Sequence, residues 1–419
     1  MHVLAKFNGN NYLEPLNSIW HSMSKALSRI SLDEALERIN NRFKVKKGHA
    51  NLSIRDAINL KLASDIVCDS DVPPLPVSMV DGFAFDAESA RLKVVGKVGP
   101  GGVYSGKIEG DQAIEVLTGA FLPAGIKYVA PKEHVKRNGD TIELSEMPAT
   151  GENIMPAGFD CKSNEIIAKG GENLSPGIAY FLNYLKVATV AVKPQARAGI
   201  FSVGNELTDN SSDRQKVSSS NPIFLTHVLE NMGVYARDLG ILNDDVEEIS
   251  ENVKRQASSY DLLITSGGSS VGERDLMKEA LLASGAEQVF HGLKLKPGRT
   301  GGLYVLNEKP IIVTSGNIQA STIETAVIGE AVLRALGFSV DRKAISAVID
   351  RDVYFDAPPD FYNVAWLKVY ELKNEIIASP VFSYSTSRSI PFRANSFTIV
   401  KSGHVKKNTV LDAYMIGSL

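Results

Sequence analysis

Acidic side chains follow three predicted strands in the second half of the chain, and one of them closes a glycine-rich turn. Glu206 lies in SVGNEL, after AGIFSV, and Asp244 lies in GILNDD, after YARDLGIL. Asp275 ends the stretch TSGGSSVGERD, which follows DLLI. Carboxylates gathered beside a phosphate-binding turn would repel an anionic substrate unless divalent cations bridge them or some take up protons. The three residues therefore predict a divalent-cation site.

The glycine-rich turn itself favours phosphate as a ligand. Gly267 and Gly268 permit positive φ, and Ser269 and Ser270 add hydroxyl donors, so the turn can wrap a phosphate before the next helix contributes its dipole. The alternative is a plain strand-to-helix connection. Asp275 has a structural alternative too, because it precedes LMKEALL and can cap that helix. Capping and catalysis do not exclude each other.

Other polar residues have a functional and a structural interpretation. Asn221 precedes Pro222 in a cap-then-proline order that explains a helix start without any ligand. Lys296 and Arg299 flank the Pro-Gly turn of KLKPGRT, where they either clamp an oxyanion or lie on a solvated surface turn. The sequence has no histidine pair at metal-ligand spacing, no nucleophile elbow, no Walker A motif and no complete GxGxxG turn, which weakens other classes of enzyme.

The elements that position these residues alternate between strand and helix from Arg197 onward. The apolar strands AGIFSV, YARDLGIL and DLLITS alternate with the helical patterns NPIFLTHVLENMG, VEEISENVKRQASS and RDLMKEALLAS. This alternation predicts a parallel sheet that helices cover on both faces, with ligands at the carboxyl ends of the strands. The acids and the glycine turn all lie at such ends, so we expect them in one cleft.

Smaller units are predicted around this α/β domain. SLDEALERI begins with a capping box at Ser31, and a second pattern, SIRDAINLKLASDI, runs into the proline cluster DVPPLP, which marks a domain crossing. The segment from about 76 to 147 has short β patterns and an Asn-Gly hairpin turn. Asp81 and Thr118 lie there in tight turns that commonly serve geometry alone. After the helix SPGIAYFLNYL and the α/β domain, residues 341–419 return to β patterns.

Composition places the chain among ordinary globular proteins. Its 419 residues allow roughly two to four domains, and a formal net charge of −3 indicates neither a nucleic acid nor an anionic membrane as partner. Cys68 and Cys161 are too few for a disulfide framework or a zinc cluster. We find no apolar export segment and no apolar run long enough to cross a bilayer, so we expect a cytoplasmic protein.

Several motifs occur in an order that resembles a known family. VPPLPVSMVDGFAF, with Asp81, resembles a proline-rich lead into S-A-M-D-G-Y-A, and LTGAFLPAG, with Thr118, resembles T-G-A-x-x-P. GFD, with Asp160, resembles G-E-D, SVGNEL resembles T-G-D-E-L, and SSN, with Asn221, resembles D-S-N. TSGGSSVGERD resembles T-G-G-x-S-x-G-x-x-D. In this order, over nearly the whole chain from about residue 31, the motifs resemble the molybdopterin molybdenumtransferases, MoeA and the E domain of gephyrin.

This resemblance implies an α/β multidomain fold. It has a three-layer α/β/α central domain of the MogA type with a mainly parallel sheet, a β-rich insert domain, a helical linker domain and a C-terminal β-barrel. The corresponding ranges are 31–75 with 148–190 for the discontinuous linker, 76–147 for the β-domain, 191–340 for the molybdopterin-binding domain and 341–419 for the barrel. The family also implies a homodimer with an active site between subunits and a MogA-type adenylyltransferase as partner.

The implied reaction inserts molybdate, or tungstate, into adenylylated molybdopterin, with Mg²⁺-dependent hydrolysis that releases AMP. By position, Asp244 and Asp275 would be the cation and hydrolysis carboxylates, and Glu206 would orient metal or water. Three further site residues would come from the other parts of the site, on the partner subunit: Asp81, Thr118 and Asp160. Substrate-binding roles would fall to Asn221, Gly267, Gly268, Ser269, Ser270, Lys296 and Arg299.

The chain departs from the family pattern at several turns. Ser315 and Ile318 replace both prolines of L-P-G-N-P-x-S, Thr300 replaces the second proline of P-G-K-P, and Thr386 stands where a glycine is usual. The loss of two rigid turns favours one alternative, a catalytically weak paralogue that acts as a molybdopterin-binding or scaffold protein. A second alternative is a molybdopterin adenylyltransferase of the MogA type, which shares the glycine turn but lacks the extra domains.

Overall fold

The computed structural model describes residues 29–45, 48–268, 275–340, 342–355, 357–384, 386–401 and 403–417. The chain divides into two compact units, of which the smaller spans Asn51–Val192 and the larger contains the chain before and after it. Each hydrophobic core cluster lies within one unit. The predicted division into four domains remains our proposal.

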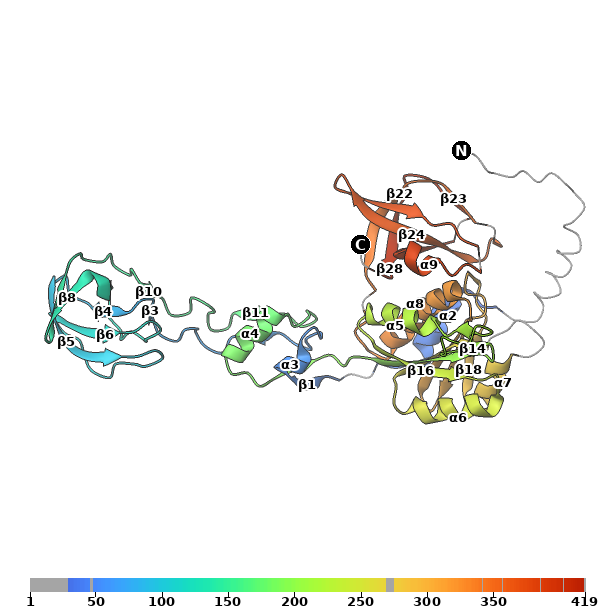
Figure 1. Cartoon of the computed structure of the whole chain (residues 1–419), viewed down its shortest axis with the longest axis horizontal. Helices are drawn as coiled ribbons and strands as arrows, with labels where there is room; N and C mark the ends of the chain where they lie inside the picture. The colour runs from blue at the N-terminus through green and yellow to red at the C-terminus, as the bar shows by residue number, and fades with distance from the viewer. Residues whose placement is uncertain are drawn as a thin grey trace, which may run out of the picture. The chain divides into compact units, whose positions relative to one another are not determined.

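A six-stranded, mainly parallel sheet forms the centre of the larger unit (Figure 1). Its spatial order is β16 (Tyr235–Leu242), β13 (Arg197–Val203), β17 (Leu262–Gly267), β21 (Lys309–Thr314), β20 (Gly302–Leu306) and β18 (Glu287–His291). β13 pairs in parallel with β16 and β17, and β17 with β21, whereas β20 is antiparallel to both of its neighbours. The antiparallel edge was not predicted. It arises because Asn307 and Glu308, both at positive φ, form a tight turn between β20 and β21.

Helices cover both faces of this sheet, which confirms the predicted three layers. One face packs against α5 (Asn221–Glu230), α8 (Ile318–Ala335) and α2 (Leu32–Arg42), and the other against α6 (Val246–Ala257) and α7 (Leu276–Ala283). Successive residues of β13 show how one strand contributes to the cores on both faces of the sheet. Ile200 joins the core of α5 and α8, whereas Phe201 joins the core of α6 and α7, because side chains alternate across a strand.

Local sequence explains where these helices begin. Ser31 Oγ accepts a hydrogen bond from the N–H of Glu34 at 3.1 Å, which confirms the predicted cap of α2. The Glu34 carboxylate bonds Arg38 instead of returning to Ser31, so only one half of the capping box forms. At α6, Asp245 accepts from the N–H of Glu248 at 2.8 Å.

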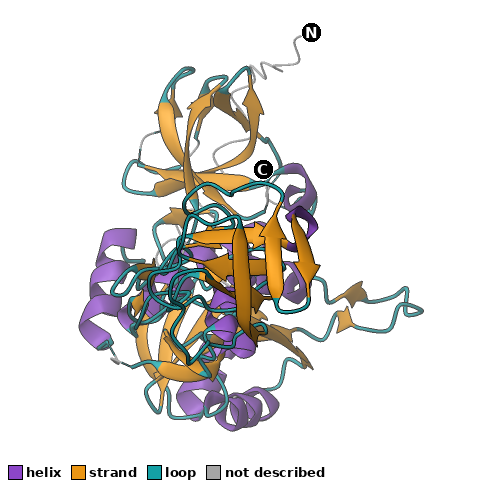
Figure 2. Cartoon of the chain, turned by 90° about the vertical axis from the view of Figure 1, so that its left-hand side faces the viewer, coloured by secondary structure: helices purple, strands orange, loops and turns teal. Residues whose placement is uncertain are grey.

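The C-terminal strands form a closed barrel within the larger unit, as expected. They pair in the order β24 (Tyr362–Leu372), β25 (Glu375–Pro380), β22 (Ala344–Ile349), β28 (Val410–Met415) and β26 (Ser396–Val400), and β26 returns to pair with β24. Figure 2 shows these strands beside the helices of the α/β domain. Trp366 and Phe397 of the barrel share a core cluster with Ile323 of α8, so the barrel packs directly on the α/β domain.

Short elements complete the larger unit. They are β14 (Leu207–Thr208), β15 (Val217–Ser218), β19 (Leu295–Lys296), β23 (Val353–Tyr354), α9 (Ile390–Arg393) and β27 (His404–Val405). β14 pairs with β15 just after β13, and β19 pairs with β24 at the edge of the barrel. Within the described parts of the chain, no helix combines the length and apolar character that a bilayer crossing requires.

The smaller unit contains a second six-stranded sheet. Its order is β7 (Tyr128–Pro131), β4 (Gly82–Phe85), β6 (Gln112–Val116), β5 (Arg91–Val98), β9 (Thr141–Leu144) and β8 (Val135–Asn138), with the short helix η1 (Lys132–His134) before β8. The predicted hairpin is confirmed, because Asn138 pairs with Thr141 across a turn of Gly139 and Asp140.

Shorter pairs and two helices form the rest of this unit. The pairs are β1 (Ala50–Ser53) with β12 (Thr189–Val192), β2 (Ile66–Val67) with β11 (Ile166–Ala168), and β3 (Val77–Ser78) with β10 (Ile154–Met155). The predicted helix near residue 176 is α4 (Pro176–Tyr184). The pattern SIRDAINLKLASDI forms only the four-residue α3 (Ile54–Ala57), since Asn59 adopts a positive φ of 67° and ends the helix.

Candidate functional site: a cavity at the strand ends

A cavity of about 920 Å³ lies at the carboxyl ends of β13 and β17. Its lining includes the start of α5, the start of α8, and the barrel residues 386–388 with Pro391. Of the predicted site residues, Glu206, Asn221 and Gly267 line it. These residues are far apart in sequence and share one cavity at the edge of the sheet where parallel strands present ligand sites.

The predicted glycine turn has the backbone geometry expected of it. Gly267 has a φ of 101° and Gly268 a φ of 68°, which confirms the positive values. A Cβ atom on Gly267 would lie 2.3 Å from the carbonyl oxygen of Val203, so only glycine fits between β17 and β13 here. The predicted phosphate ligands Ser269 and Ser270 lie outside the described residues.

Asn221 connects two strand ends beside the cavity. Its Nδ2 donates to Ser266 Oγ at 2.8 Å and to the carbonyl oxygen of Gly316 at 2.9 Å. The prediction that Asn221 caps its helix is wrong, because Ser220 occupies the cap position and Asn221 is the first helical residue. The side chain is already engaged with β17 and with the turn before α8, so it holds the cavity wall together.

Glu206 and Asp244 are exposed carboxylates at the ends of β13 and β16. Asn205 joins these two ends: its N–H donates to Asp244 Oδ2 at 3.1 Å, and the N–H of Asp244 donates to Asn205 Oδ1 at 3.1 Å. The Glu206 carboxylate folds back over Gly204, where an added Cβ would lie 2.5 Å from Glu206 Oε2. Both carboxylates are therefore positioned by backbone contacts and remain open to solvent.

Asp275 caps α7, as its sequence position indicates, and it also has a buried partner. Oδ1 accepts from the N–H of Lys278 at 3.1 Å. Oδ2 lies 2.8 Å from His291 Nε2, although the two atoms are not aligned for a hydrogen bond and neither has another such partner in the described structure. The imidazole thus faces the carboxylate from the end of β18.

A second buried contact orients His291. Its Nδ1 lies 2.7 Å from Tyr304 Oη, and Tyr304 Oη in turn donates to Gln288 Oε1 at 3.4 Å. Burial, together with the nearby Asp275 carboxylate, raises the pKa of Tyr304, so the phenol stays protonated. Sequence reasoning missed His291 because it considered only histidine pairs at metal-ligand spacing, whereas this partner lies across the fold.

The three predicted metal carboxylates do not form a preformed cluster. Within the described ranges, no group of three or more His, Cys, Asp or Glu side chains is arranged to hold a metal ion. Mg²⁺ commonly takes only one or two protein carboxylates and completes its coordination with water and substrate phosphate. The exposed carboxylates of Glu206 and Asp244 fit that mode of binding.

The predicted basic residues Lys296 and Arg299 follow β18. Lys296 is in β19 and pairs with Asn363 of the barrel, and neither Lys296 nor Arg299 is among the described residues that line the cavity. Burial and the neighbouring Arg299 lower the pKa of Arg29. Arg388, which the motifs did not indicate, is part of the lining.

A buried carboxylic acid connects the two turns that lack the family prolines. Glu324 Oε2 accepts from the N–H of Ser315 at 2.7 Å and Oε1 from Ser315 Oγ at 3.1 Å, while Thr300 Oγ1 lies 2.6 Å from Ser315 Oγ. Burial raises the pKa of Glu324 to about 7, against the lowering effect of the bonds from Ser315 and Gly301. A signal was present in sequence, since Glu324 is an acid among apolar residues of IETAVIGEAV.

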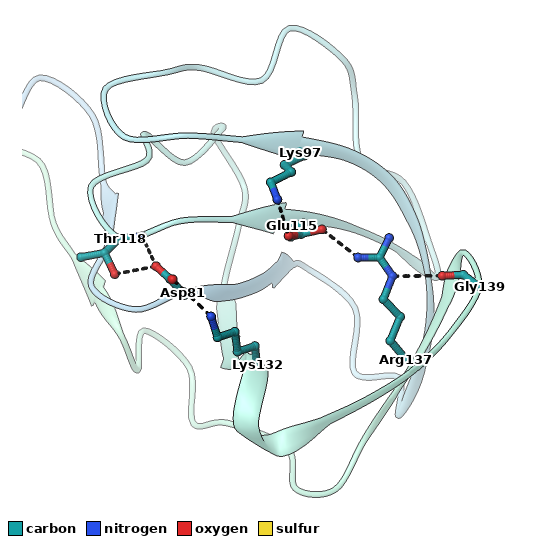
Figure 3. A network of polar contacts seen from close by, with 7 residues as sticks. All are labelled: Asp81, Lys97, Glu115, Thr118, Lys132, Arg137 and Gly139. Carbon is teal, nitrogen blue, oxygen red and sulfur yellow. Dashed lines mark hydrogen bonds and ion pairs between the residues drawn. The ribbon is translucent and has the colours of Figure 1, made fainter.

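In the smaller unit, Asp81 and Thr118 are in direct contact (Figure 3). Asp81 Oδ1 accepts from the N–H of Thr118 at 2.8 Å and from its Oγ1 at 3.0 Å, and Lys132 Nζ lies 3.4 Å from Oδ2. The Thr118 hydrogen bonds and then Lys132 lower the pKa of Asp81. Asp160 is exposed, and its N–H donates to the carbonyl oxygen of Val72.

Comparison with known proteins identifies both halves of the chain. Residues 30–183 match the MoeA N-terminal region (domain I and II), and residues 199–335 match a probable molybdopterin binding domain. The molybdopterin molybdenumtransferase of Haemophilus influenzae is 31% identical over 64% of this chain and 68% of its own length. That of Bacillus subtilis is 27% identical over 89% and 90%.

A solved structure has the same fold. The molybdopterin biosynthesis MoeA protein from Pyrococcus horikoshii aligns with a TM-score of 0.75 at 22% identity, over 94% of this chain and 100% of its own. The ordered motifs, the matched regions and the shared fold agree with one another. The chain therefore belongs to the MoeA family, with the MoeA N-terminal region and the molybdopterin-binding domain typical of molybdopterin molybdenumtransferases.

Proposed function

We propose that the protein inserts molybdate, or tungstate, into adenylylated molybdopterin and releases AMP. The observation that carries this proposal is the cavity at the ends of β13 and β17, which brings Glu206, Asn221 and Gly267 together in a chain of the MoeA family. The relatives named molybdopterin molybdenumtransferase, at 27–31% identity, support the same reaction.

Each residue has a role that its surroundings favour. The positive φ values at Gly267 and Gly268 fit a turn whose backbone N–H groups would contact substrate phosphate. Asn221 keeps that turn beside α8 through its bonds to Ser266 and Gly316. Asp275, whose Oδ1 caps α7 and whose Oδ2 lies beside His291, is suited to orient the water that breaks the pyrophosphate bond to AMP.

Glu206 and Asp244 are the residues that would hold Mg²⁺, because their carboxylates are exposed at adjacent strand ends. Mg²⁺, when bound, would offset the charge on the phosphates as the bond to AMP breaks. We also propose that the protein acts as a cytoplasmic homodimer, that Asp81, Thr118 and Asp160 serve the same reaction, and that a MogA-type adenylyltransferase supplies its substrate.

The direct test is AMP release by the purified protein with Mg²⁺, molybdate and adenylylated molybdopterin. We expect Asp275→Asn to lower the rate by about 100-fold or more, since it removes a charge at the reacting phosphate. Asp245→Asn is the matched control. Both aspartates cap helices of the same sheet, and asparagine caps as well as aspartate, so both variants should keep their thermal stability.

A second candidate function is a molybdopterin-binding or scaffold protein without turnover. The serine and isoleucine at positions 315 and 318, in place of family prolines, favour it. Substrate that binds with unchanged affinity to wild type and Asp275→Asn, without AMP release by either, would establish this alternative. Formation of adenylylated molybdopterin from ATP and molybdopterin would instead indicate an adenylyltransferase.

A further inference from the structure

Arg388 is the single lysine or arginine among the described residues that line the cavity. The other ionisable lining residues are Glu206, Glu230 and His227. The cavity proposed to take an anionic substrate therefore carries two carboxylates and one permanent positive charge in its described lining. An arginine in this position is the natural partner for an anionic group of the ligand.

The loop that carries Arg388 is attached to the helix that begins at the cavity. Gln319 lies in the first turn of α8, and its side-chain amide donates to the carbonyl oxygens of Tyr384 at 2.8 Å and Ser387 at 3.0 Å. Gln319 is only 5% exposed, so these bonds are shielded from water. Because Arg388 directly follows Ser387, these bonds also keep Arg388 near the start of α8.

The same helix start leads to the glycine turn. Gly316 and Asn317 immediately precede α8 and line the cavity, and the carbonyl oxygen of Gly316 accepts from Asn221, which also bonds Ser266 of β17. A continuous set of contacts thus runs from the Arg388 loop through the start of α8 to the end of β17. A ligand in the cavity can meet both the arginine and the turn.

The guanidinium of Arg388 is exposed and makes no hydrogen bond or ion pair with any described residue. Arg351, an exposed arginine of the same barrel, instead pairs with Asp350 at 3.0 Å. Neither carboxylate of the cavity neutralises Arg388, and no described residue occupies any of its five N–H donors. A planar guanidinium matches two oxygens of a tetrahedral oxyanion in a bidentate contact.

We propose that Arg388 is the anion-binding residue of the cavity and contacts a tetrahedral oxyanion of the substrate. That oxyanion is either the phosphate of the AMP portion or the free metalate, which are both tetrahedral and negatively charged. The inference rests on the proposed function of the cavity and adds a residue to which the sequence motifs assign no role.

Calorimetric titration of the full-length protein tests the proposal, with AMP, adenosine and molybdate as separate ligands in the presence of Mg²⁺. We expect Arg388→Ala to weaken binding of AMP by roughly 10- to 100-fold, the usual range for a lost charge-assisted hydrogen bond. Arg388→Lys should lose less affinity for AMP than Arg388→Ala, because lysine keeps the positive charge but not the bidentate geometry. Adenosine lacks the phosphate and should bind both variants like wild type. A loss confined to molybdate would identify the free metalate as the ligand.

Arg393→Ala is the matched control, since this exposed arginine lies five positions on and outside the cavity lining. The proposal is overturned if Arg388→Ala binds AMP and molybdate like wild type, if Arg393→Ala loses as much, or if wild type binds neither ligand. Thermal melts confirm that each variant is folded. The proposed function is judged separately by AMP release: an inactive wild type with Arg388-dependent binding would refute the reaction and retain the anion site.

Discussion

Glu324 is a fully buried carboxylic acid whose partners occupy positions where the family pattern has prolines. Its strongest contact is with the N–H of Ser315 at 2.7 Å, and the Ser315 hydroxyl lies 2.6 Å from that of Thr300. Proline has no N–H, so a proline at position 315 could not make the first of these bonds. Hydrogen bonds that connect Ser315 to Thr300 and Glu324 therefore hold the turns where the family pattern has prolines.

The protonation of Glu324 should make stability depend on pH. Its pKa rises from an ordinary 4.5 to about 7 in the folded protein. Between these pH values the folded state holds a proton that the unfolded state has lost. The free energy of unfolding therefore falls as pH rises through this range, and the loss is complete above about pH 7. The cost is on the order of 3 kcal/mol.

Glu324→Gln removes this titration. We expect the difference in free energy of unfolding, variant minus wild type, to rise by about 3 kcal/mol between roughly pH 4.5 and pH 8. Urea denaturation of the larger unit at several pH values measures it. Glu371→Gln, at an exposed site on β24, is the control and should follow wild type. If the free energies of unfolding of wild type and Glu324→Gln change in parallel with pH, Glu324 does not hold a proton in the folded state.

At the scale of elements, the close approach of β13 and β17 sets the shape of the cavity edge. At the end of β17, a Cβ on Gly267 would lie 2.3 Å from the carbonyl oxygen of Val203, and a Cβ on Gly316 would lie 3.5 Å from the Gly267 Cα. Gly267 and Gly268 have no room for a side chain, because added Cβ atoms would lie 2.3 Å and 2.9 Å from their nearest neighbours. The backbone itself is thus the surface offered to a ligand.

Gly267→Ala should therefore lower the free energy of unfolding far more than an alanine whose only strain is a positive φ. We expect a loss of about 3 kcal/mol or more in the free energy of unfolding, because the new Cβ would lie 2.3 Å from Val203 O. Gly285→Ala is the matched control. Gly285 has a φ of 88° but no atom within 4 Å of its Cβ position, so we expect only about 1 kcal/mol. If chemical denaturation shows that Gly267→Ala and Gly285→Ala lose the same free energy of unfolding, the backbone near Val203 shifts without cost to admit the new Cβ.

At the scale of the whole molecule, the chain builds two units with separate cores. The smaller unit contains core clusters of its own, and its first strand, β1, pairs with its last, β12. Its ends therefore meet, as they do in domains that fold independently. The barrel differs, because it shares a core cluster with α8 and α5 of the α/β domain.

A fragment of residues 51–192 should fold alone. We expect a cooperative thermal transition in circular dichroism and dispersed amide signals in NMR spectra, since about 140 residues are enough for an independent core. Ile114→Asp in the same fragment places a charge at a position with no exposed surface and should abolish the transition. A fragment that stays unfolded without this substitution would mean that the smaller unit depends on the rest of the chain.

Much of the fold followed from local patterns in the sequence. Apolar strands and amphipathic helices alternate within short windows, and the caps at Ser31 and Asp275 depend on residues three positions away. The positive φ at Gly267 likewise follows from the residue type. Such features depend on neighbours in sequence, which is why periodicity and turn chemistry predict them. The ordered motifs added the family, and with it the closed barrel.

The surroundings of the candidate site were decided only by tertiary structure. The side-chain amide of Asn221, expected to cap a helix, instead donates hydrogen bonds to residues 45 and 95 positions away in sequence. His291 meets Asp275 because β18 pairs at the antiparallel edge, and Arg388 reaches the cavity because the barrel packs on α8. Local propensity acts over a few residues, whereas these contacts depend on strand order and on how two domains share a core.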